Sequence, residues 1–572
     1  MNPNNASYPY QINNPTDSQR HEMLEYVLRD EKRKDDLRNI IDSMSPPEDI
    51  LSISKNRNCK DIKVAVIGSG EAGLASVFEL RKIGCNITLF EASQRIGGRV
   101  YTYYFDRSNK QYGEFGPMSI PLSHETTWHY INLFNLETAP FVTDNENSLF
   151  YIRGGAAFND QKGRSVSKNI YPKFNLSNKE RKKSWIELKE TIYLEYLNSL
   201  SIEARKELID IKKEYSTEIK EIDKLSYRSA CQNLNLSDEA ISMLLYLEGN
   251  GHYLNLGFIE FLQKKYTCDS KYNYYIKDGM VNLPYSLYEA ICDRNKHAYS
   301  DIDRTMLGKV NIKMGSPVVG IYNTESENKV ILKYNDSLDK KEVLEEFNYV
   351  ICAVPFSSLK RIELKPLFSN VKMRAINDMN YEEAQKIYLY CKERFWEKGN
   401  LSKRIIGGYS HTDMPLVSIY YPSDHSKQVL SKSGKWIMNS EKFDNESGAL
   451  LASYSWGQNA VRFGSENIDL QINDVIAYIS KIHNISESYI KSIVMDYKSI
   501  IWSDIQYIWG GGALSNPQDK VLFSYEVTLP EMDSKVFFAG EHISQKHISQ
   551  QGALQSGMIV ANEVAKQINE NY

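Results

Sequence analysis

The sequence predicts an α/β fold with interleaved domains: a parallel sheet with its helices, a second, mixed β-sheet and a helical insertion. Three observations predict this fold. A continuous apolar run over 63–68 enters a glycine-rich turn, charged segments with helical spacing occupy about 175–262, and short strand-like runs return from 310 onwards. A continuous apolar run of this kind is typical of a parallel strand that is buried on both faces.

Size and charge limit the classes of protein that this chain can be. It has 572 residues, 42% hydrophobic and 25% charged, which is typical of a folded protein. Domains cluster at roughly 100–200 residues, so one compact core is excluded. Lys and Arg total 69 against 73 Asp and Glu, a net charge of −4 that provides no basic surface for nucleic acid. We therefore expect no nucleic-acid partner.

The N-terminus has neither a basic start nor an apolar stretch, and no run of about 18 apolar residues occurs in the chain. We expect neither a signal peptide nor a membrane span. The seven cysteines are scattered without a CxxC pair, which indicates reduced thiols and no metal site. A cytoplasmic location is the expectation that follows.

Residues 1–60 are polar and charged, with a helical stretch over 21–44 that carries one apolar face. We expect this segment to be an N-terminal helical arm. The arm either packs on the rest of the chain or forms a contact in a possible homodimer, and the sequence leaves both open.

A GxGxxG motif, Gly68-Ser-Gly70-Glu-Ala-Gly73, lies between the apolar run and a helical run over 74–83. Gly68 permits the tight turn, Gly70 lets the backbone approach a pyrophosphate, and Gly73 allows the helix to pack closely on the strand. Phosphates bind at such a helix N-terminus, and Glu91, after the next strand, is placed to accept hydrogen bonds from a ribose diol. The motif in this context predicts a Rossmann-like dinucleotide-binding unit.

The rest of the chain alternates between helical and strand-like patterns. Apolar positions recur every three or four residues in the helical insertion, and its charge runs indicate solvated faces. Strands are expected over 310–314, 318–322, 329–334 and 349–354, and we expect them to rejoin the sheet that opens at 63. Further strands over 385–391, 417–421, 448–454 and 535–538 precede a final helix over about 552–568.

Two motifs at opposite ends of the chain carry a family resemblance. Residues 91–99 form an ExxxRxGGR run, and Gly540-Glu541 is followed by Gln-Gly-Ala-Leu-Gln-Ser-Gly over 551–557. On these motifs the sequence resembles the flavin-dependent amine oxidase family, over about 500 residues from 63 to the C-terminus. Segments 278–284, 316–321 and 349–355 match the family's DGMxxLP turn, its valine-bearing strand and its VIxxxP strand end. Segments 386–396 and 452–456 look most like the branch of L-amino-acid oxidases and amino-acid 2-monooxygenases.

The resemblance implies FAD as the cofactor and a Rossmann-like FAD-binding domain of the GR2 type. Arg95 and Arg99 suit the diphosphate, because a guanidinium keeps its charge and binds phosphate oxygens bidentately. The last helix is expected to aim its N-terminus at the isoalloxazine, where its dipole stabilises negative charge on the reduced ring. The residues expected to contact the cofactor are Gly68, Gly70, Gly73, Glu91, Arg95, Gly98, Arg99, Met118, Val318, Gly540, Glu541, Gln551, Gly552 and Ala553.

Because the cofactor motifs recur along the chain, the domains are expected to interleave. The FAD-binding domain is expected to combine 61–105, 270–365 and 505–572. A mixed β-sheet substrate-binding domain is expected from 106–165 and 366–504, and a helical domain from 166–269.

The resemblance also implies three catalytic residues. Lys386 aligns with the lysine that holds a water near flavin N5 in this family, and a buried ammonium needs such a partner. Tyr454 matches the tyrosine whose hydroxyl binds the substrate carboxylate. Trp456, two residues further on, points to the same face of the sheet. An exposed lysine and core aromatics without ligand contact are the alternatives.

The substrate pocket departs from the family pattern at two places. Ser119 stands where amino-acid-oxidising members have an arginine that grips the α-carboxylate, and a serine hydroxyl cannot form a bidentate clamp. Before the last helix, 547–550 read His-Ile-Ser-Gln where the family has Trp or Tyr, so the wall at Ser549 is open, and Trp509 is a candidate to fill it. His252 and His547 are candidates to touch the pocket, although a lone histidine is more often structural.

The implied function is an FAD-dependent oxidase of a small amine or amino-acid-derived substrate. A hydride passes from the amine-bearing carbon to flavin N5, and O2 reoxidises the flavin, giving an imine or carbonyl product, ammonia and H2O2. Ser119 argues against a free α-amino acid held in the usual way. An L-amino-acid oxidase or 2-monooxygenase with an unusual carboxylate clamp is one alternative. A non-catalytic FAD-binding protein and an NAD-dependent dehydrogenase are alternatives of another class.

Overall fold

A five-stranded parallel sheet, in the order β22-β13-β1-β2-β9, forms one end of the molecule. The structure is a computed structural model that describes residues 9–571, apart from 55–58, 109, 296, 325–328, 338–340, 427–440, 442 and 444. The sheet collects strands from distant parts of the chain: β1 (Lys63–Ile67), β2 (Asn86–Phe90), β9 (Val310–Lys313), β13 (Tyr349–Cys352) and β22 (Val536–Phe538).

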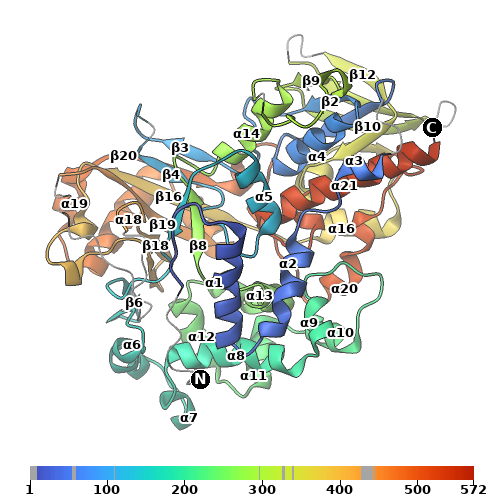
Figure 1. Ribbon diagram of the computed structural model, residues 1–572. Coiled ribbons are helices and arrows are strands. Elements are labelled where there is room, and N and C mark those ends of the chain that lie inside the picture. The colour runs from blue at the N-terminus through green and yellow to red at the C-terminus, as the bar shows by residue number, and fades with distance from the viewer. Residues whose placement is uncertain are drawn as a thin grey trace.

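Strand β1 explains why this sheet is buried on both faces. Val64 and Val66 belong to the core beneath the helices, whereas Ala65 and Ile67 belong to a separate core on the other face, as the two-residue period of a strand requires. On the first face, α4 (Glu71–Lys82) packs against α14 (Asn282–Ile291) and along α21 (Gln550–Asn571). These three helices lie side by side in Figure 1.

A second, four-stranded sheet covers the other face and corrects one expectation. It has the order β12-β11-β10-β14, from β10 (Val318–Thr324), β11 (Lys329–Asn335), β12 (Glu342–Phe347) and β14 (Glu363–Lys365). The strands predicted over 318–322 and 329–334 therefore do not rejoin the parallel sheet. The connection between them is too short for a parallel crossover, so β10 and β11 pair as an antiparallel hairpin.

A seven-stranded mixed sheet, in the order β20-β16-β19-β18-β17-β6-β7, lies beside the parallel sheet. Its strands are β6 (Leu149–Ile152), β7 (Gly155–Phe158), β16 (Ala384–Cys391), β17 (Tyr409–Thr412), β18 (Ser418–Tyr420), β19 (Gly448–Trp456) and β20 (Val494–Ile501). One face packs on α18 (Ile468–His483) and α19 (Glu487–Ile493). Next in the chain after β19 comes α17 (Gly457–Gly464).

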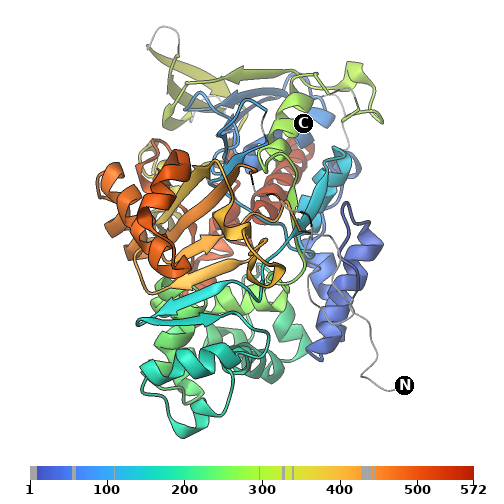
Figure 2. The same cartoon turned by 90° about the vertical axis from the view of Figure 1, so that its left-hand side faces the viewer.

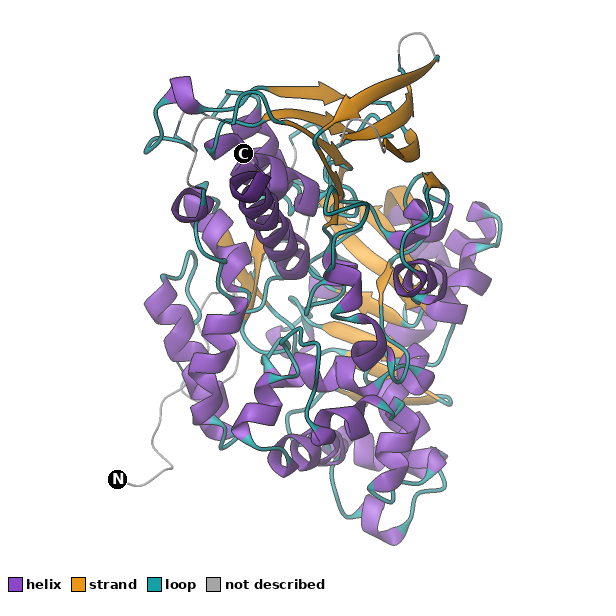
Figure 3. Ribbon diagram, turned by 90° about the vertical axis from the view of Figure 1, so that its right-hand side faces the viewer, coloured by secondary structure: helices purple, strands orange, loops and turns teal. Residues whose placement is uncertain are grey.

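The predicted helical insertion forms short helices that gather at the opposite end of the molecule from the parallel sheet, as Figures 2 and 3 show. Many begin with a serine whose hydroxyl accepts a backbone N–H, such as Ser184 before α8. The helices are α6 (Arg164–Asn169), α7 (Asn178–Arg181), α8 (Trp185–Ser199), α9 (Ile202–Lys206), α10 (Thr217–Asp223), α11 (Tyr227–Asn233), α12 (Asp238–Leu247) and α13 (Phe258–Tyr266).

Shorter elements connect these layers. The helices are α5 (Glu125–Leu133), α15 (Phe356–Leu359), α16 (Asn370–Asp378) and α20 (Asp519–Phe523). The two-stranded pairs are β3 (Thr102–Tyr104) with β4 (Tyr112–Glu114), β5 (Thr138–Phe141) with β8 (Asn273–Ile276), and β15 (Tyr381–Glu382) with β21 (Gly512–Ala513). The fold class predicted from the sequence is confirmed, and the domain limits given above stay a prediction.

The N-terminal arm forms three helices, α1 (Asp17–Asp30), α2 (Leu37–Met44) and α3 (Ile50–Ile53), where one stretch over 21–44 was expected. The helix breaks because Lys32 has a φ of 59°, and the buried Arg33 turns inward to donate hydrogen bonds to Glu31 and to the Tyr266 carbonyl.

The arm packs on its own chain. The buried apolar face of α1 belongs to the core beneath the helices. The α21 side chain of Gln555 donates hydrogen bonds to the carbonyls of Ser43 and Ser45. None of the seven cysteines, all of which the structure describes, forms a disulfide. In the described part of the chain no helix has the length and apolar character to cross a membrane.

Candidate active site

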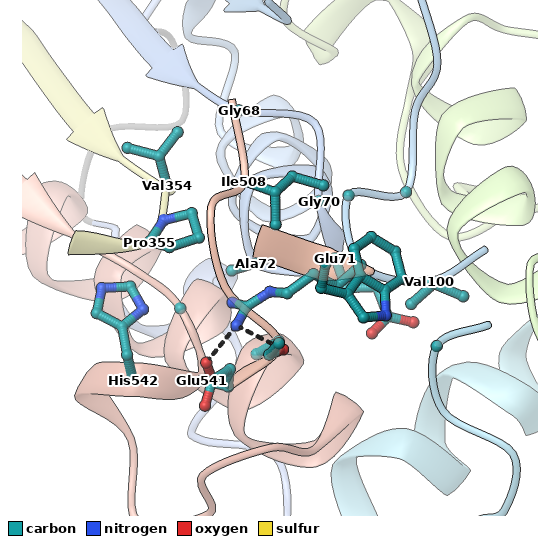
Figure 4. A pocket seen from close by; sticks show the side chains of 18 of the residues that line it. Gly68, Gly70, Glu71, Ala72, Val100, Val354, Pro355, Ile508, Glu541 and His542 are labelled. Carbon is teal, nitrogen blue, oxygen red and sulfur yellow. Dashed lines mark hydrogen bonds and ion pairs between the residues drawn. The ribbon is translucent and has the colours of Figure 1, made fainter. Parts of the chain in front are cut away.

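A cavity of about 600 Å³ runs from the carboxyl ends of the parallel strands to the inner face of the seven-stranded sheet. Residues from both ends of the chain meet in it. Gly68 and Gly70 from the first turn face Glu541 and His542 from the last (Figure 4). The carboxyl edge of a parallel sheet is where ligands bind in open α/β folds.

The three glycines of the GxGxxG motif play different parts. Gly68 has a φ of +102°, and a Cβ there would lie 2.7 Å from the Ala353 carbonyl oxygen. A Cβ on Gly73 would lie 1.9 Å from the Gly68 carbonyl oxygen, so only glycine lets α4 approach β1 this closely. A Cβ on Gly70 would meet nothing nearer than the Gly98 Cα at 4.0 Å, and Gly70 lines the cavity. The space in front of Gly70 is therefore open to a ligand.

Glu91 follows the last residue of β2 and lines the cavity. One carboxylate oxygen accepts hydrogen bonds from the backbone and hydroxyl of Ser69, and the other accepts those of Ser93. The two backbone bonds fix the carboxylate. Because a hydroxyl can rotate away, each oxygen can exchange a serine for a ribose hydroxyl.

The two arginines of the ExxxRxGGR run are held differently. The Arg95 guanidinium donates to the carbonyls of Ile96, Gly98 and Val100, which shapes the turn that carries Gly98. Arg99 pairs with Glu541 at 2.7 Å and joins the motifs from the two ends of the chain, as the dashed line to Glu541 in Figure 4 marks. Both arginines line the cavity.

The residues around Gly70 fit a diphosphate-containing cofactor. The N-termini of α4 and α21 both border the cavity, and such helix ends favour anions. Glu71, at the start of α4, would repel a diphosphate if it were ionised, but burial raises its pKa to about 8, so the protonated form predominates at pH 7. Its carboxyl accepts a hydrogen bond from Gln550 at the start of α21. Both ring nitrogens of His542, which lines the cavity, are buried without a hydrogen-bond partner in the described chain.

Lys386, Tyr454 and Trp456 come together on one face of the seven-stranded sheet. Lys386 on β16 lies directly opposite Tyr454 on β19, and its ammonium lies 4.5 Å from the centre of the Tyr454 ring. Trp456 is two residues along the same strand, opposite the small Ala384. All three line the cavity. Burial raises the pKa of Tyr454 well above its usual value, so its hydroxyl stays neutral.

Lys386 is 3% exposed, and its ammonium donates to the carbonyl oxygens of Glu114 at 3.0 Å and Gly116 at 2.6 Å. An ammonium has three donors, so one N–H is left for a water or a ligand in the cavity. Burial lowers the pKa of Lys386 to about 7, although the Glu114 charge acts against this. Burial also raises the pKa of the Glu114 carboxyl to about 7.

The lowered pKa of Lys386 predicts a pH-dependent effect of Lys386→Met on stability. The folded-state pKa lies below the usual value of 10.5, so the contribution of Lys386 to stability is complete above pH 10.5 and is lost as the pH falls toward 7. Methionine has no such loss. The difference in melting temperature, variant minus wild type, should be larger at about pH 6.5 than at about pH 9.5. An equal difference at both values in thermal unfolding would contradict the shift.

The pocket residues that the sequence singled out are distributed over several walls. Ser119, Trp509 and Ser549 line the cavity. The Arg361 guanidinium lies over the ring of Trp509, 4.1 Å from the ring centre, in a cation–π contact. Ser549 precedes α21, and its hydroxyl accepts the backbone N–H of Gly552, as a helix cap does. His547 also lines the cavity, and its ring bonds to the Glu260 carboxylate at 2.7 Å.

Four of the predicted site residues do not line the cavity. Gly73 packs α4 on β1, as described. The side-chain oxygen of Gln551 accepts the backbone N–H groups of Thr126 and Thr127 on α5, and its NH2 group donates to the Met44 carbonyl. Gln551 therefore connects the arm to α21. A Cβ on Gly552 would lie 2.2 Å from the Lys546 carbonyl oxygen. His252 stacks on Trp456 with ring centres 5.6 Å apart and an interplanar angle of 9°. The other predicted cofactor contacts, Met118, Val318, Gly540 and Ala553, line the cavity.

Glu71, His542 and Lys264 are among the residues that line the cavity but were not predicted as site residues. Glu71 lies inside the GxGxxG motif and His542 follows Gly540-Glu541 directly, so the neighbouring motif residues already indicated a cofactor site at these positions. Lys264 lies on α13 in the helical insertion, where its charge resembles that of a solvated helix face, and only the folded chain brings it to the cavity.

One cavity is bordered by a glycine motif, a carboxylate at a strand end and two helix N-termini. This combination defines a dinucleotide-binding protein, and the seven-stranded sheet adds a wall for a substrate. The chain belongs to the flavin-containing amine oxidoreductase family, whose model matches residues 72–565. It is therefore an oxidoreductase that acts on CH–NH2 donors, and its cofactor is FAD.

Two relatives show the extent of the similarity. The L-amino-acid oxidase of Sistrurus catenatus edwardsii is 28% identical over 530 residues, covering 90% of each chain. The putative L-amino-acid oxidase YobN of Bacillus subtilis (strain 168) is 28% identical over 505 residues, covering 88% of this chain and 94% of its own. The family resemblance found in the motifs is thereby confirmed.

Solved structures share the fold. Putrescine oxidase bound to putrescine superposes with a TM-score of 0.64 at 15% identity, over 88% of this chain and 98% of that one. Cyclohexylamine oxidase from Brevibacterium oxydans IH-35A gives a TM-score of 0.61 at 15% identity, over 89% and 99%.

Proposed function

We propose that this protein oxidises a small amine or amino-acid-derived substrate with dioxygen, giving an imine that hydrolyses to a carbonyl compound, with ammonia and H2O2. One observation carries the proposal: Lys386, Tyr454 and Trp456 share one face of the seven-stranded sheet and line the same cavity as Gly70 and the two helix N-termini. Bound FAD supplies the redox chemistry by accepting a hydride from the amine-bearing carbon and passing its electrons to dioxygen.

The side chains of the cavity hold and orient the reactants. Tyr454 and Trp456 present aromatic surfaces that restrict the substrate to one orientation, and positioning is the main contribution that such a pocket makes to rate. Lys386 has one N–H left by Glu114 and Gly116, and we assign this N–H to binding a water at the cavity wall.

The substrate class has two candidates. The relatives named above are called L-amino-acid oxidases. The proteins of the solved structures are named as oxidases of simple amines, putrescine and cyclohexylamine. Ser119 lacks the charge that would bind a carboxylate. A 2-monooxygenase outcome stays an alternative. A homodimer and a cytoplasmic location stay predictions from the sequence.

Purified protein should be yellow, with an absorbance band near about 450 nm that amines or amino acids bleach when oxygen is excluded. In air, the same compounds should produce H2O2 and ammonia in equal amounts. A yellow protein that yields no peroxide with any compound of a broad amine and amino-acid panel would favour a non-catalytic role of FAD. Colourless protein that oxidises amines with NAD would favour a dehydrogenase.

A further inference from the structure

Lys264 is the lysine that the helical insertion contributes to the cavity. It lies on α13 and lines the cavity, with its ammonium 5.7 Å from the centre of the Tyr253 ring and 5.9 Å from that of Phe261. Burial, together with the Lys264 charge, lowers the pKa of the neighbouring His252 to about 3. Since His252 stacks on Trp456, Lys264 belongs to the wall that carries the aromatic residues.

The ammonium of Lys264 keeps its charge. Burial acts against the charged form, but Tyr253, Glu260 and Asp269 raise its pKa. Neither carboxylate forms an ion pair with Lys264, because Glu260 pairs with His547 at 2.7 Å and Asp269 pairs with Lys546 at 2.7 Å. Within the described residues, Lys264 forms no ion pair shorter than 4.0 Å.

The other basic side chains of the cavity are occupied. Arg95 and Lys386 donate to backbone carbonyls, Arg99 pairs with Glu541, and Arg361 donates to the Ser357 carbonyl. Among the described lysines and arginines that line the cavity, Lys264 alone has no carboxylate or carbonyl partner, and its hydrogen-bond partner is the Tyr253 hydroxyl. A charge removed from bulk water needs a partner, and a cavity-facing one finds it in a ligand.

We propose that Lys264 binds a carboxylate of the substrate, so that the oxidised amine is an amino acid or another amine that carries an acid group. This inference rests on the oxidase function proposed above. It places the anionic group near His252, which stacks on Trp456. The amine-bearing carbon is then held between this anchor and the Lys386–Tyr454 pair.

The test is a binding titration on the purified, flavin-containing enzyme. Benzoate is the carboxylate probe and benzamide its neutral control, and binding is followed by the shift of the flavin band near about 450 nm. Lys264→Met should raise the benzoate Kd about tenfold or more, because a hydrogen bond to a charged group is lost. Lys264→Arg should retain most of the affinity, and benzamide should bind all three proteins alike.

Controls separate the possible sources of an effect. The exposed Lys271→Met should leave the benzoate Kd unchanged. A benzoate Kd that is equal in wild type and Lys264→Met, or no benzoate binding to the wild type, would overturn the proposal. Loss of FAD from Lys264→Met and from Lys264→Gln would also overturn it, because the lysine would then bind the cofactor's own phosphates.

Failure of the oxidase function would look different. The titration uses oxidised enzyme and needs no turnover. A wild type that binds benzoate through Lys264 yet forms no peroxide with any amine would overturn the oxidase function and leave the carboxylate site in place.

Discussion

Lys386→Met is expected to reduce the turnover rate about 100-fold or more without loss of FAD, which is the usual effect of removing a group that moves or holds a proton. Two N–H groups of the ammonium donate to backbone carbonyls, which fix its position, and the third can hold a water. A thioether has no N–H to donate. The pKa of about 7 also predicts a change of rate with pH near neutrality in the wild type that the variant loses.

The measurement separates the two halves of the reaction. Bleaching of the flavin band under nitrogen reports substrate oxidation, and its return on mixing with oxygenated buffer reports the oxygen step. Lys498→Met, on the adjacent strand β20 and outside the cavity lining, is the matched control and should behave as wild type. Unchanged turnover in Lys386→Met would remove the role that we assign to this lysine.

The sequence predicted the parts of the site that depend on local pattern. The apolar run and glycine turn defined β1, Gly68 and Gly70, because one buried strand and one tight turn need particular residues in a row. The shared face of Tyr454 and Trp456 follows from the two-residue period of a strand. Lys386 was found through the resemblance, and its place opposite Tyr454 depends on the register of two strands about 70 residues apart, which no local pattern contains.

The failures have the same physical origin. The strands β10 and β11 were recognised but assigned to the wrong sheet, because pairing is decided by connection length and burial rather than by strand propensity. Lys264 gave no signal because a lysine on an amphipathic helix is most often solvated. The arm was recognised as helical, but the buried Arg33 that breaks it acts through partners near residue 266.

The cofactor site closes only when the two ends of the chain meet. Arg99 bonds to Glu541, and Gln550 bonds to Glu71, so each end supplies a charged or polar partner for the other. The intervening segments build the substrate wall and the helical region that brings in Lys264. A site of this kind depends on long-range contacts, so binding of FAD should stabilise the whole chain rather than one domain.

Gly70→Ala is expected to weaken FAD binding about tenfold or more while the apoprotein folds normally, since a forced overlap costs about 1–3 kcal/mol. The added methyl group meets no atom of the described residues closer than 4.0 Å, so the protein alone tolerates it. The same methyl group occupies the open space before the N-terminus of α4, where the diphosphate is expected. FAD content after purification and the Kd from titration of the apoprotein with FAD measure the effect.

Two other glycines supply the controls for Gly70→Ala. A Cβ on Gly251 meets nothing within 4 Å, so Gly251→Ala should keep both the fold and the cofactor. Gly73→Ala should lower stability even without FAD, because its methyl group would collide with the Gly68 carbonyl 1.9 Å away. If Gly70→Ala retained full FAD affinity, the pyrophosphate would not approach the backbone at Gly70. If it instead unfolded the apoprotein, the space before α4 would be occupied by protein and not by the cofactor.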